Sequence, residues 1–123
     1  MDCNKFAKLI QDAFPVGSEF KNPGGGTSLI TSNTPEKVAY RRGNSTIYVA
    51  FNDLFSAYNK FKGSVATSTD LRKFLPSVYD STARPAGHSC NCTFLFEALE
   101  RIGLAGRLSG RGVRGDPFKA EIL

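Results

Sequence analysis

The chain has 123 residues, of which 41% are hydrophobic and 22% charged, and this balance excludes an intrinsically disordered protein. The length suits a single domain, residues 1–123, with a real hydrophobic core. The formal net charge of +5 favours nucleic acid or another anionic surface as the partner. No apolar run approaches the roughly 18 residues of a membrane span, and no secretory signal is recognisable. We therefore expect a cytoplasmic or nucleoid-associated protein.

The first 51 residues predict a helix followed by a β-meander. Apolar side chains at helical spacing predict a helix over 2–14 that ends at Pro15. Residues 23–26, Pro-Gly-Gly-Gly, predict a loop. A flexible connection is favoured over a phosphate-binding loop here, because no Lys-Ser/Thr pair follows. Three runs rich in β-branched residues then predict short antiparallel strands over 29–51.

Two helices follow in the second half of the chain. Asn52 and Asp53 predict the start of a helix that ends at Gly63. Residues 67–70, Thr-Ser-Thr-Asp, are typical of a second helix start, and Pro76 is expected to end that helix. Its inner face is apolar, while Arg72 and Lys73 point away from it.

A third helix is predicted to start near Ser89 or Asn91 and to end at Ile102, with Gly103 as the residue after it. Its apolar stripe predicts one buried face. The polar residues are expected to face outward or to lie in the first turn, where Ser89 and Asn91 would also cap the helix. These polar residues are His88, Ser89, Asn91, Thr93, Glu97 and Arg101.

Residues 104–122 predict a β-hairpin rich in Arg and Gly. One strand would run over 104–108 and the other over 118–122, joined by a thin glycine-bearing tip. Arg107, Arg111 and Arg114 have no acid between them, and arginines in such a tip can hold phosphates or enter a minor groove. The same arginine- and glycine-rich composition occurs in RNA-binding segments. The hairpin therefore favours DNA without excluding RNA.

Residues 52–122 resemble the winged helix-turn-helix superfamily in the order of their elements, namely helix, capped helix, striped helix and basic hairpin. The resemblance covers a little over half of the chain. It implies an α+β fold with a winged-helix-like three-helix core and a C-terminal β-hairpin wing, preceded over 1–51 by the N-terminal helix and the short antiparallel meander.

The resemblance also implies duplex DNA binding, with the third helix in the major groove and the wing on the backbone. Four residues would then read bases, because small polar side chains at a helix N-terminus suit base edges. These are His88, Ser89, Asn91 and Thr93. Arginines of the connection and wing would hold the backbone, with two cations of the second helix assisting. These are Arg84, Arg107, Arg111, Arg114, Arg72 and Lys73.

His88, Cys90 and Cys92 are the one cluster that could carry other chemistry. Zinc is disfavoured, because a single residue between two cysteines makes a poor chelate and a fourth ligand would be needed, for which Cys3 is one candidate. A Cys/His nucleophile pair is less favoured than buried structural cysteine. The acids are too scattered for the metal site of a nuclease.

The sequence therefore predicts a non-catalytic DNA-binding protein without cofactor or metal. The alternative is a small protein-interaction module, such as an adaptor or an inhibitor of a nucleic-acid enzyme, that presents the same basic face to an acidic protein surface.

Overall fold

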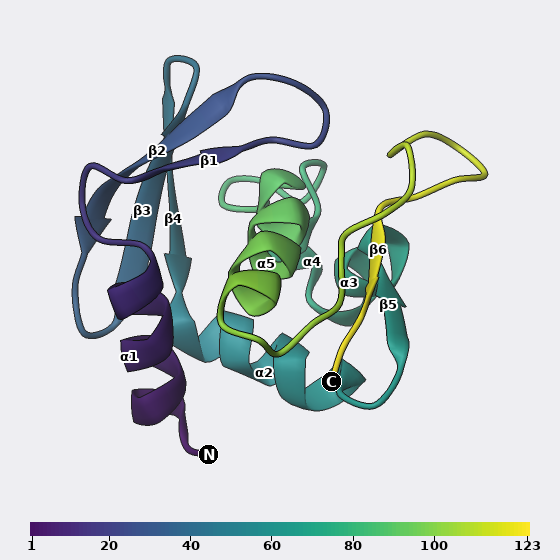
Figure 1. Cartoon of the computed structure of the whole chain (residues 1–123). Helices are drawn as coiled ribbons and strands as arrows, with labels where there is room; N and C mark the ends of the chain where they lie inside the picture. The colour runs from purple at the N-terminus through teal and green to yellow at the C-terminus, as the bar shows by residue number, and fades with distance from the viewer. The chain divides into compact units, whose positions relative to one another are not determined.

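The computed structural model describes all 123 residues, Met1–Leu123, and has an α+β fold, as predicted (Figure 1). Its contacts divide the chain into two compact units, Met1–Ser56 and Ala57–Leu123, with the division inside one helix. The elements in chain order are α1 (Cys3–Ala13), β1 (Glu19–Lys21), β2 (Thr27–Asn33), β3 (Lys37–Arg42), β4 (Ser45–Ala50), α2 (Phe51–Phe61), β5 (Val65–Thr67), α3 (Ser68–Phe74), α4 (Pro76–Tyr79), α5 (Cys90–Arg101) and β6 (Lys119–Glu121).

The first unit contains a four-stranded antiparallel sheet with the order β1-β2-β3-β4. The predicted meander corresponds to β2, β3 and β4, and the sequence analysis missed the short strand β1. The alternation in β4 follows the pleat of a half-buried strand, because Ile47 and Val49 are buried and Thr46 and Tyr48 are exposed. Phe51, which continues the alternation in the sequence, instead opens α2.

Helix α1 lies beside this sheet (Figure 1). The Asp2 side chain caps it by accepting a hydrogen bond from the backbone N–H of Lys5 at 2.8 Å. Phe6, Ala7 and Ile10 on its apolar face are buried. The ring of Phe14 packs edge-on against Phe20, which packs in the same way against Tyr40 of β3, with centroids 5.9 and 5.6 Å apart. Such edge-to-face stacks combine large apolar burial with favourable ring electrostatics.

The second unit contains the smaller sheet, in which β5 and β6 pair antiparallel with Thr67 opposite Lys119. Thr67 is both the last residue of β5 and the N-cap of α3. Its Oγ1 accepts a hydrogen bond from the N–H of Asp70, and the Asp70 carboxylate accepts one from the N–H of Thr67, each at 3.0 Å. This reciprocal pair is a capping box, and it fixes the first turn of α3 against the end of the strand.

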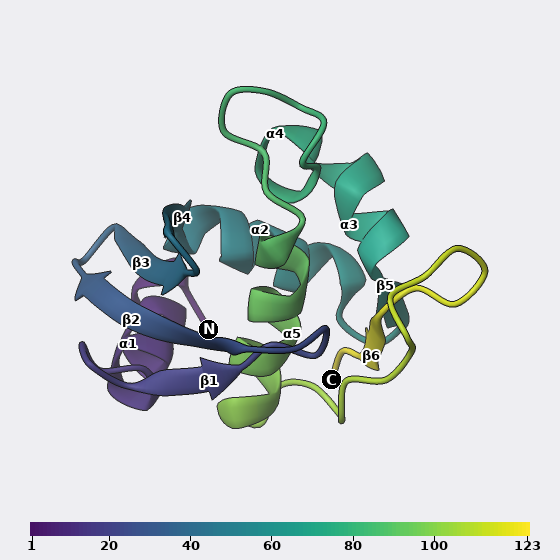
Figure 2. The same ribbon diagram turned by 90° about the horizontal axis from the view of Figure 1, so that it is seen from above.

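The predicted C-terminal hairpin wing is wrong. Residues 104–108 form no strand and meet the end of the chain only through isolated bridges, Ala105 to Ile122 and Ser109 to Lys119. The regular partner of β6 is β5. Glycine explains the difference, because Gly103, Gly106 and Gly110 interrupt the segment and glycine weakens a strand interior. The result is an irregular loop that projects beyond the β5–β6 ribbon (Figure 2).

The helix limits are close to those predicted, with two corrections. Helix α2 begins at Phe51, so Asn52 and Asp53 lie in its first turn and do not precede it. Pro76 follows the end of α3, as expected, but also occupies the first position of α4. Proline suits that position because its missing N–H would have no partner there. No helix in this structure has the length and apolar character needed to cross a bilayer.

We expect Thr67→Val to lower the free energy of unfolding by about 0.5–2 kcal/mol, because it keeps the β-branched shape but removes the capping oxygen. Urea unfolding followed by circular dichroism measures the change. Thr46→Val is the matched control, since Thr46 is exposed on β4 and should change stability by less than about 0.5 kcal/mol. Equal effects of the two substitutions would contradict a role for the capping box.

Candidate nucleic-acid interface

Positive charge is concentrated in the second unit. Residues 57–123 contain ten Lys and Arg against six Asp and Glu, whereas residues 1–56 contain six against five. The second unit therefore carries four of the five net positive charges. Arg107, Arg114 and Lys119 are exposed and make no salt bridge. Their charges are available to an external anion.

The first turn of α3 holds Arg72 in a fixed direction. Leu71 is fully buried and anchors the inner face of the helix. On the other side, a guanidinium Nη2 of Arg72 donates to Thr69 Oγ1 at 3.2 Å. Ser68 is buried, and its N–H donates to the carbonyl of Phe118 at 2.8 Å. The start of α3 is thus attached directly to the segment that follows the C-terminal loop.

Residues 109–117, the C-terminal loop, form a closed structure. Ser109 and Lys119 exchange two backbone hydrogen bonds of 2.9 Å at its base. The N–H and Nε–H of Arg111 both donate to Asp116 Oδ2, at 3.2 and 3.0 Å. The hydrogen bond from the Arg111 side chain is the main cause that holds the pKa of Asp116 below its usual range. Arg111 therefore has an internal partner, which the sequence analysis did not foresee.

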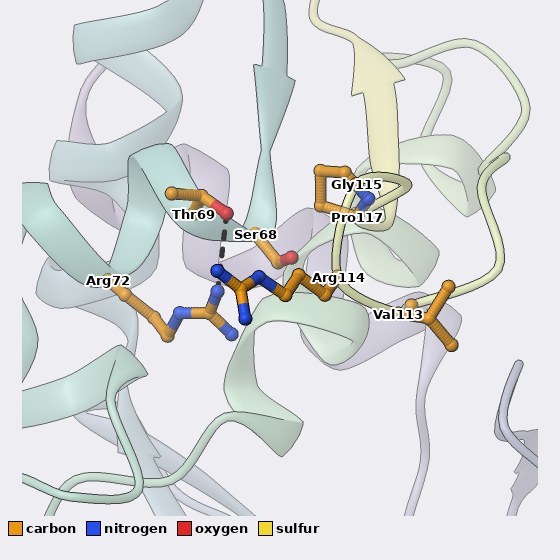
Figure 3. Close-up of a pocket in the computed structure, with 8 residues that line it drawn as sticks. Ser68, Thr69, Arg72, Val113, Arg114, Gly115 and Pro117 are labelled. Atoms are coloured by element: carbon orange, nitrogen blue, oxygen red, sulfur yellow. Dashed lines mark hydrogen bonds between the residues drawn. The ribbon is translucent and has the colours of Figure 1, made fainter.

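Two glycines allow the loop to fold back this closely. Gly110 and Gly112 have φ values of +92° and +70°, and a Cβ at these positions would collide with the Pro117 carbonyl and the Phe118 ring. Both the backbone conformation and the space therefore require glycine. The close approach directs Arg114, on the far side of the loop, toward α3 (Figure 3).

A cavity of about 390 Å³ lies between α3 and the C-terminal loop. The side chains of Arg72 and Arg114 converge on it from opposite sides (Figure 3). We call this space the α3–loop cavity, and its lining consists of Ser68, Thr69, Arg72, Gly112, Val113, Arg114, Gly115 and Pro117. The lining includes two guanidinium groups and two hydroxyls.

Three acids of the second unit that lie close in sequence to the lining or interact with Arg72 or Arg111 have partners, and Asp70 is one of them through the capping box. Asp116 binds Arg111. Asp80 accepts hydrogen bonds from the N–H and the hydroxyl of Thr82, and these are the main cause of its lowered pKa, with a smaller contribution from the charge of Arg72. No carboxylate lines the cavity itself. Two like charges that share a hollow repel each other, so an anion between them would be favoured.

A second hollow, of about 250 Å³, follows the other side of the ribbon. It contains Arg107, Lys119 and Glu121, together with Val65, Gly106, Ser109 and Ala120. The sequence analysis missed Lys119 and the cavity residues Ser68 and Thr69. The alternation along β6 could have indicated Lys119, because Lys119 and Glu121 are exposed and Ala120 between them is buried.

The other predicted phosphate contacts are dispersed. Lys73 on α3 and Arg84 in the connection after α4 are both exposed. His88 is half-buried just before α5, and its N–H forms the backbone hydrogen bond to the Val78 carbonyl. None of these three lines the α3–loop cavity. The structure thus brings together Arg72 and Arg114 from the predicted set.

Asn91 and Thr93 lie in the first turn of α5, as the sequence analysis allowed, but neither side chain faces outward. Asn91 is 1% exposed, and its amide donates to the Val78 carbonyl at 3.0 Å. Thr93 is also buried, and its hydroxyl donates to the Cys90 carbonyl at 3.0 Å. Eight of the twelve residues of α5 are buried, and Asn91 and Thr93 are among them, so these two side chains satisfy polar groups within the protein. In this structure they cannot reach the edge of a base.

The capping expected of Ser89 and Asn91 is wrong. Ser89 does precede α5, but its side chain makes no capping hydrogen bond. Its hydroxyl is hydrogen-bonded to that of Ser81 at 2.9 Å, and Ser81 Oγ accepts from the Ser89 N–H. The pair joins the two ends of the connection between α4 and α5.

The two thiols of the Cys/His cluster differ in burial, and that of Cys90 is half-buried. Cys92 is buried, and burial is the main cause that raises the pKa of its thiol to about 12. A thiol with such a pKa is not a nucleophile at neutral pH. No group of three or more His, Cys, Asp or Glu side chains is positioned to hold a metal ion.

Comparisons with protein-family models, with curated proteins and with solved structures gave no match.

We expect Asn91→Ala to lower the free energy of unfolding by about 0.5–1.5 kcal/mol, because the variant loses the hydrogen bond from the buried amide to the Val78 carbonyl, which then keeps only the His88 N–H as its donor. Urea unfolding measures this change in the free energy of unfolding. The control is Asn59→Ala at an exposed position on α2, which should be within about 0.5 kcal/mol of the parent. An Asn91→Ala variant as stable as Asn59→Ala would show that the buried amide is not needed.

We expect Gly110→Ala to destabilise the protein by about 1–3 kcal/mol more than Gly115→Ala. Both residues have positive φ, at +92° and +85°, so the backbone strain is shared. Only at position 110 would the new methyl group collide with the Pro117 carbonyl, whereas at 115 it meets open space. Thermal unfolding compares the two variants. Equal losses would mean that the loop is not packed as closely as described.

Proposed function

We propose that this protein is a non-catalytic DNA-binding protein that holds the phosphate backbone of a duplex with the basic surface of its second unit. The observation that supports the proposal is the set of exposed cations without salt bridges on α3 and around the C-terminal loop. These are Lys73, Arg107, Arg114 and Lys119. Such groups bind DNA largely by releasing the counterions that condense on phosphates.

The distribution of aromatic residues favours a duplex over a single strand. Proteins that bind single strands without strong sequence preference stack bases on exposed aromatic rings. The aromatic side chains of residues 57–123 are all buried or half-buried. Cations on a surface without exposed rings suit the regular backbone of a double helix.

The resemblance to winged helix-turn-helix proteins remains an interpretation of the helix order α2, α3 and α5. In that interpretation, α5 corresponds to the recognition helix. Because Asn91 and Thr93 of α5 are buried, we assign the DNA contacts to α3 and to the cations in and beside the C-terminal loop. Backbone contacts position a protein on DNA but do not read its sequence. We therefore expect binding that depends weakly on base sequence.

One observation favours the alternative, a protein-interaction module. Val113 is 50% exposed at the tip of the C-terminal loop, between Arg111 and Arg114. An apolar side chain surrounded by arginines suits the centre of a protein interface. In that case the partner would present an acidic surface.

Fluorescence anisotropy with a labelled duplex, repeated over a series of salt concentrations, tests the proposal. We expect the logarithm of the binding constant to fall with the logarithm of the salt concentration, with a slope of about −0.9 per neutralised phosphate. The variant Arg107→Gln/Lys119→Gln should reduce the steepness of this slope by about 2, one for each phosphate contact.

The control is Lys21→Gln/Arg41→Gln, which removes the same two charges from exposed positions on β1 and β3 of the first unit. It should leave the slope unchanged. Equal effects of the two double variants would show that net charge, and not the basic surface of the second unit, causes binding. No binding at low salt would refute the proposed function and favour the protein-interaction module.

A further inference from the structure

The α3–loop cavity is built for a small anionic group. Arg72 enters it from α3 and Arg114 from the C-terminal loop, so two guanidinium groups converge on one space (Figure 3). Arginine binds phosphate oxygens with a planar fork of donors. The hydroxyls of Ser68 and Thr69 lie on the same lining. Thr69 Oγ1 accepts from Arg72, which leaves its own O–H free to donate.

The size of the α3–loop cavity limits what can enter. At about 390 Å³, it falls in the range of pockets that hold small molecules, and it cannot contain a double helix. A continuous backbone could only pass across its mouth. A group at the end of a strand, by contrast, can be inserted between α3 and the loop.

The positive charge of the α3–loop cavity favours a terminal phosphate over a phosphate in the middle of a strand. A phosphate in the middle of a strand is a diester with one negative charge and two free oxygens. A terminal phosphate is a monoester, which carries about −1.5 to −2 charges at neutral pH and presents three acceptor oxygens. Two guanidiniums without a carboxylate in the lining complement this larger charge better.

We propose that the α3–loop cavity binds the terminal phosphate of a DNA strand, with Arg72 and Arg114 as its two cationic ligands. This inference rests on the proposed DNA binding, because it names the part of the DNA that one portion of the basic surface recognises. The exposed Arg107 and Lys119 would hold the adjacent backbone, while the α3–loop cavity gives a preference for phosphorylated ends.

The test compares three blunt duplexes of one sequence, with 5′-phosphate, 3′-phosphate or hydroxyl ends, in anisotropy titrations at one salt concentration. We expect the parent to bind one of the phosphorylated duplexes about tenfold more tightly than the hydroxyl-ended one, the scale of one added charge-assisted contact. The variant Arg72→Gln/Arg114→Gln should bind all three duplexes alike.

The variant Arg107→Gln/Lys119→Gln is the matched control, because it removes two charges outside the α3–loop cavity. It should weaken binding to all three duplexes and keep the ratio between them. Circular dichroism checks that the variants fold. The single variant Arg114→Gln, at an exposed position, is a second test and should also lose the preference for a phosphorylated end.

The outcomes separate the two proposals. Equal binding of the three duplexes by the parent would overturn the end-phosphate site and leave the proposed function standing. A preference for a phosphorylated end that is unchanged in Arg72→Gln/Arg114→Gln would likewise overturn the end-phosphate site and leave the proposed function standing. Binding of none of the duplexes would overturn both.

Discussion

The junction at Thr67 positions the functional elements of the second unit. Thr67 pairs with Lys119 across the small sheet and, through the capping box with Asp70, starts α3 in the next residue. The following hydrogen bond, from the Ser68 N–H to the Phe118 carbonyl, continues the contact beyond the strands. A strand, a helix start and the end of the C-terminal loop are therefore held together by a few short backbone contacts.

The α3–loop cavity is a direct consequence of this junction. Arg72 lies one turn into α3, and Arg114 lies at the tip of a loop whose end is fixed beside the start of that helix. Neither residue is brought to the cavity by an ion pair, because Asp116 is occupied by Arg111 and Asp80 by Thr82. The backbone therefore brings the two like charges together, although like charges repel each other. The strain of the tight loop is absorbed by Gly110 and Gly112.

The polar residues at the start of α5 make contacts within the protein. Asn91 supplies a donor to the Val78 carbonyl, and the Cys92 thiol lies within reach of the Ser68 and Tyr79 carbonyls at 3.8 and 3.6 Å. These contacts connect α5 to α4 and to the start of α3. The polar side chains at the beginning of α5 thus connect it to the elements that carry the basic surface, and each hydrogen bond also satisfies a buried side chain of α5 that water cannot reach.

The sequence alone determined the fold class, the meander, the approximate limits of the helices and the excess of positive charge, because periodicity, caps and glycines are local signals. It could not determine that residues 104–108 would fail to form a strand, since β5 and residues 104–108 were both available to pair with β6. It also could not show that Asn91 is buried, because its hydrogen-bond partner, the Val78 carbonyl, is 13 residues away in the chain and is brought beside α5 only by the fold. Only the tertiary structure brings Arg72 and Arg114 together, because their convergence depends on the pairing of β5 with β6, which lie far apart in the chain.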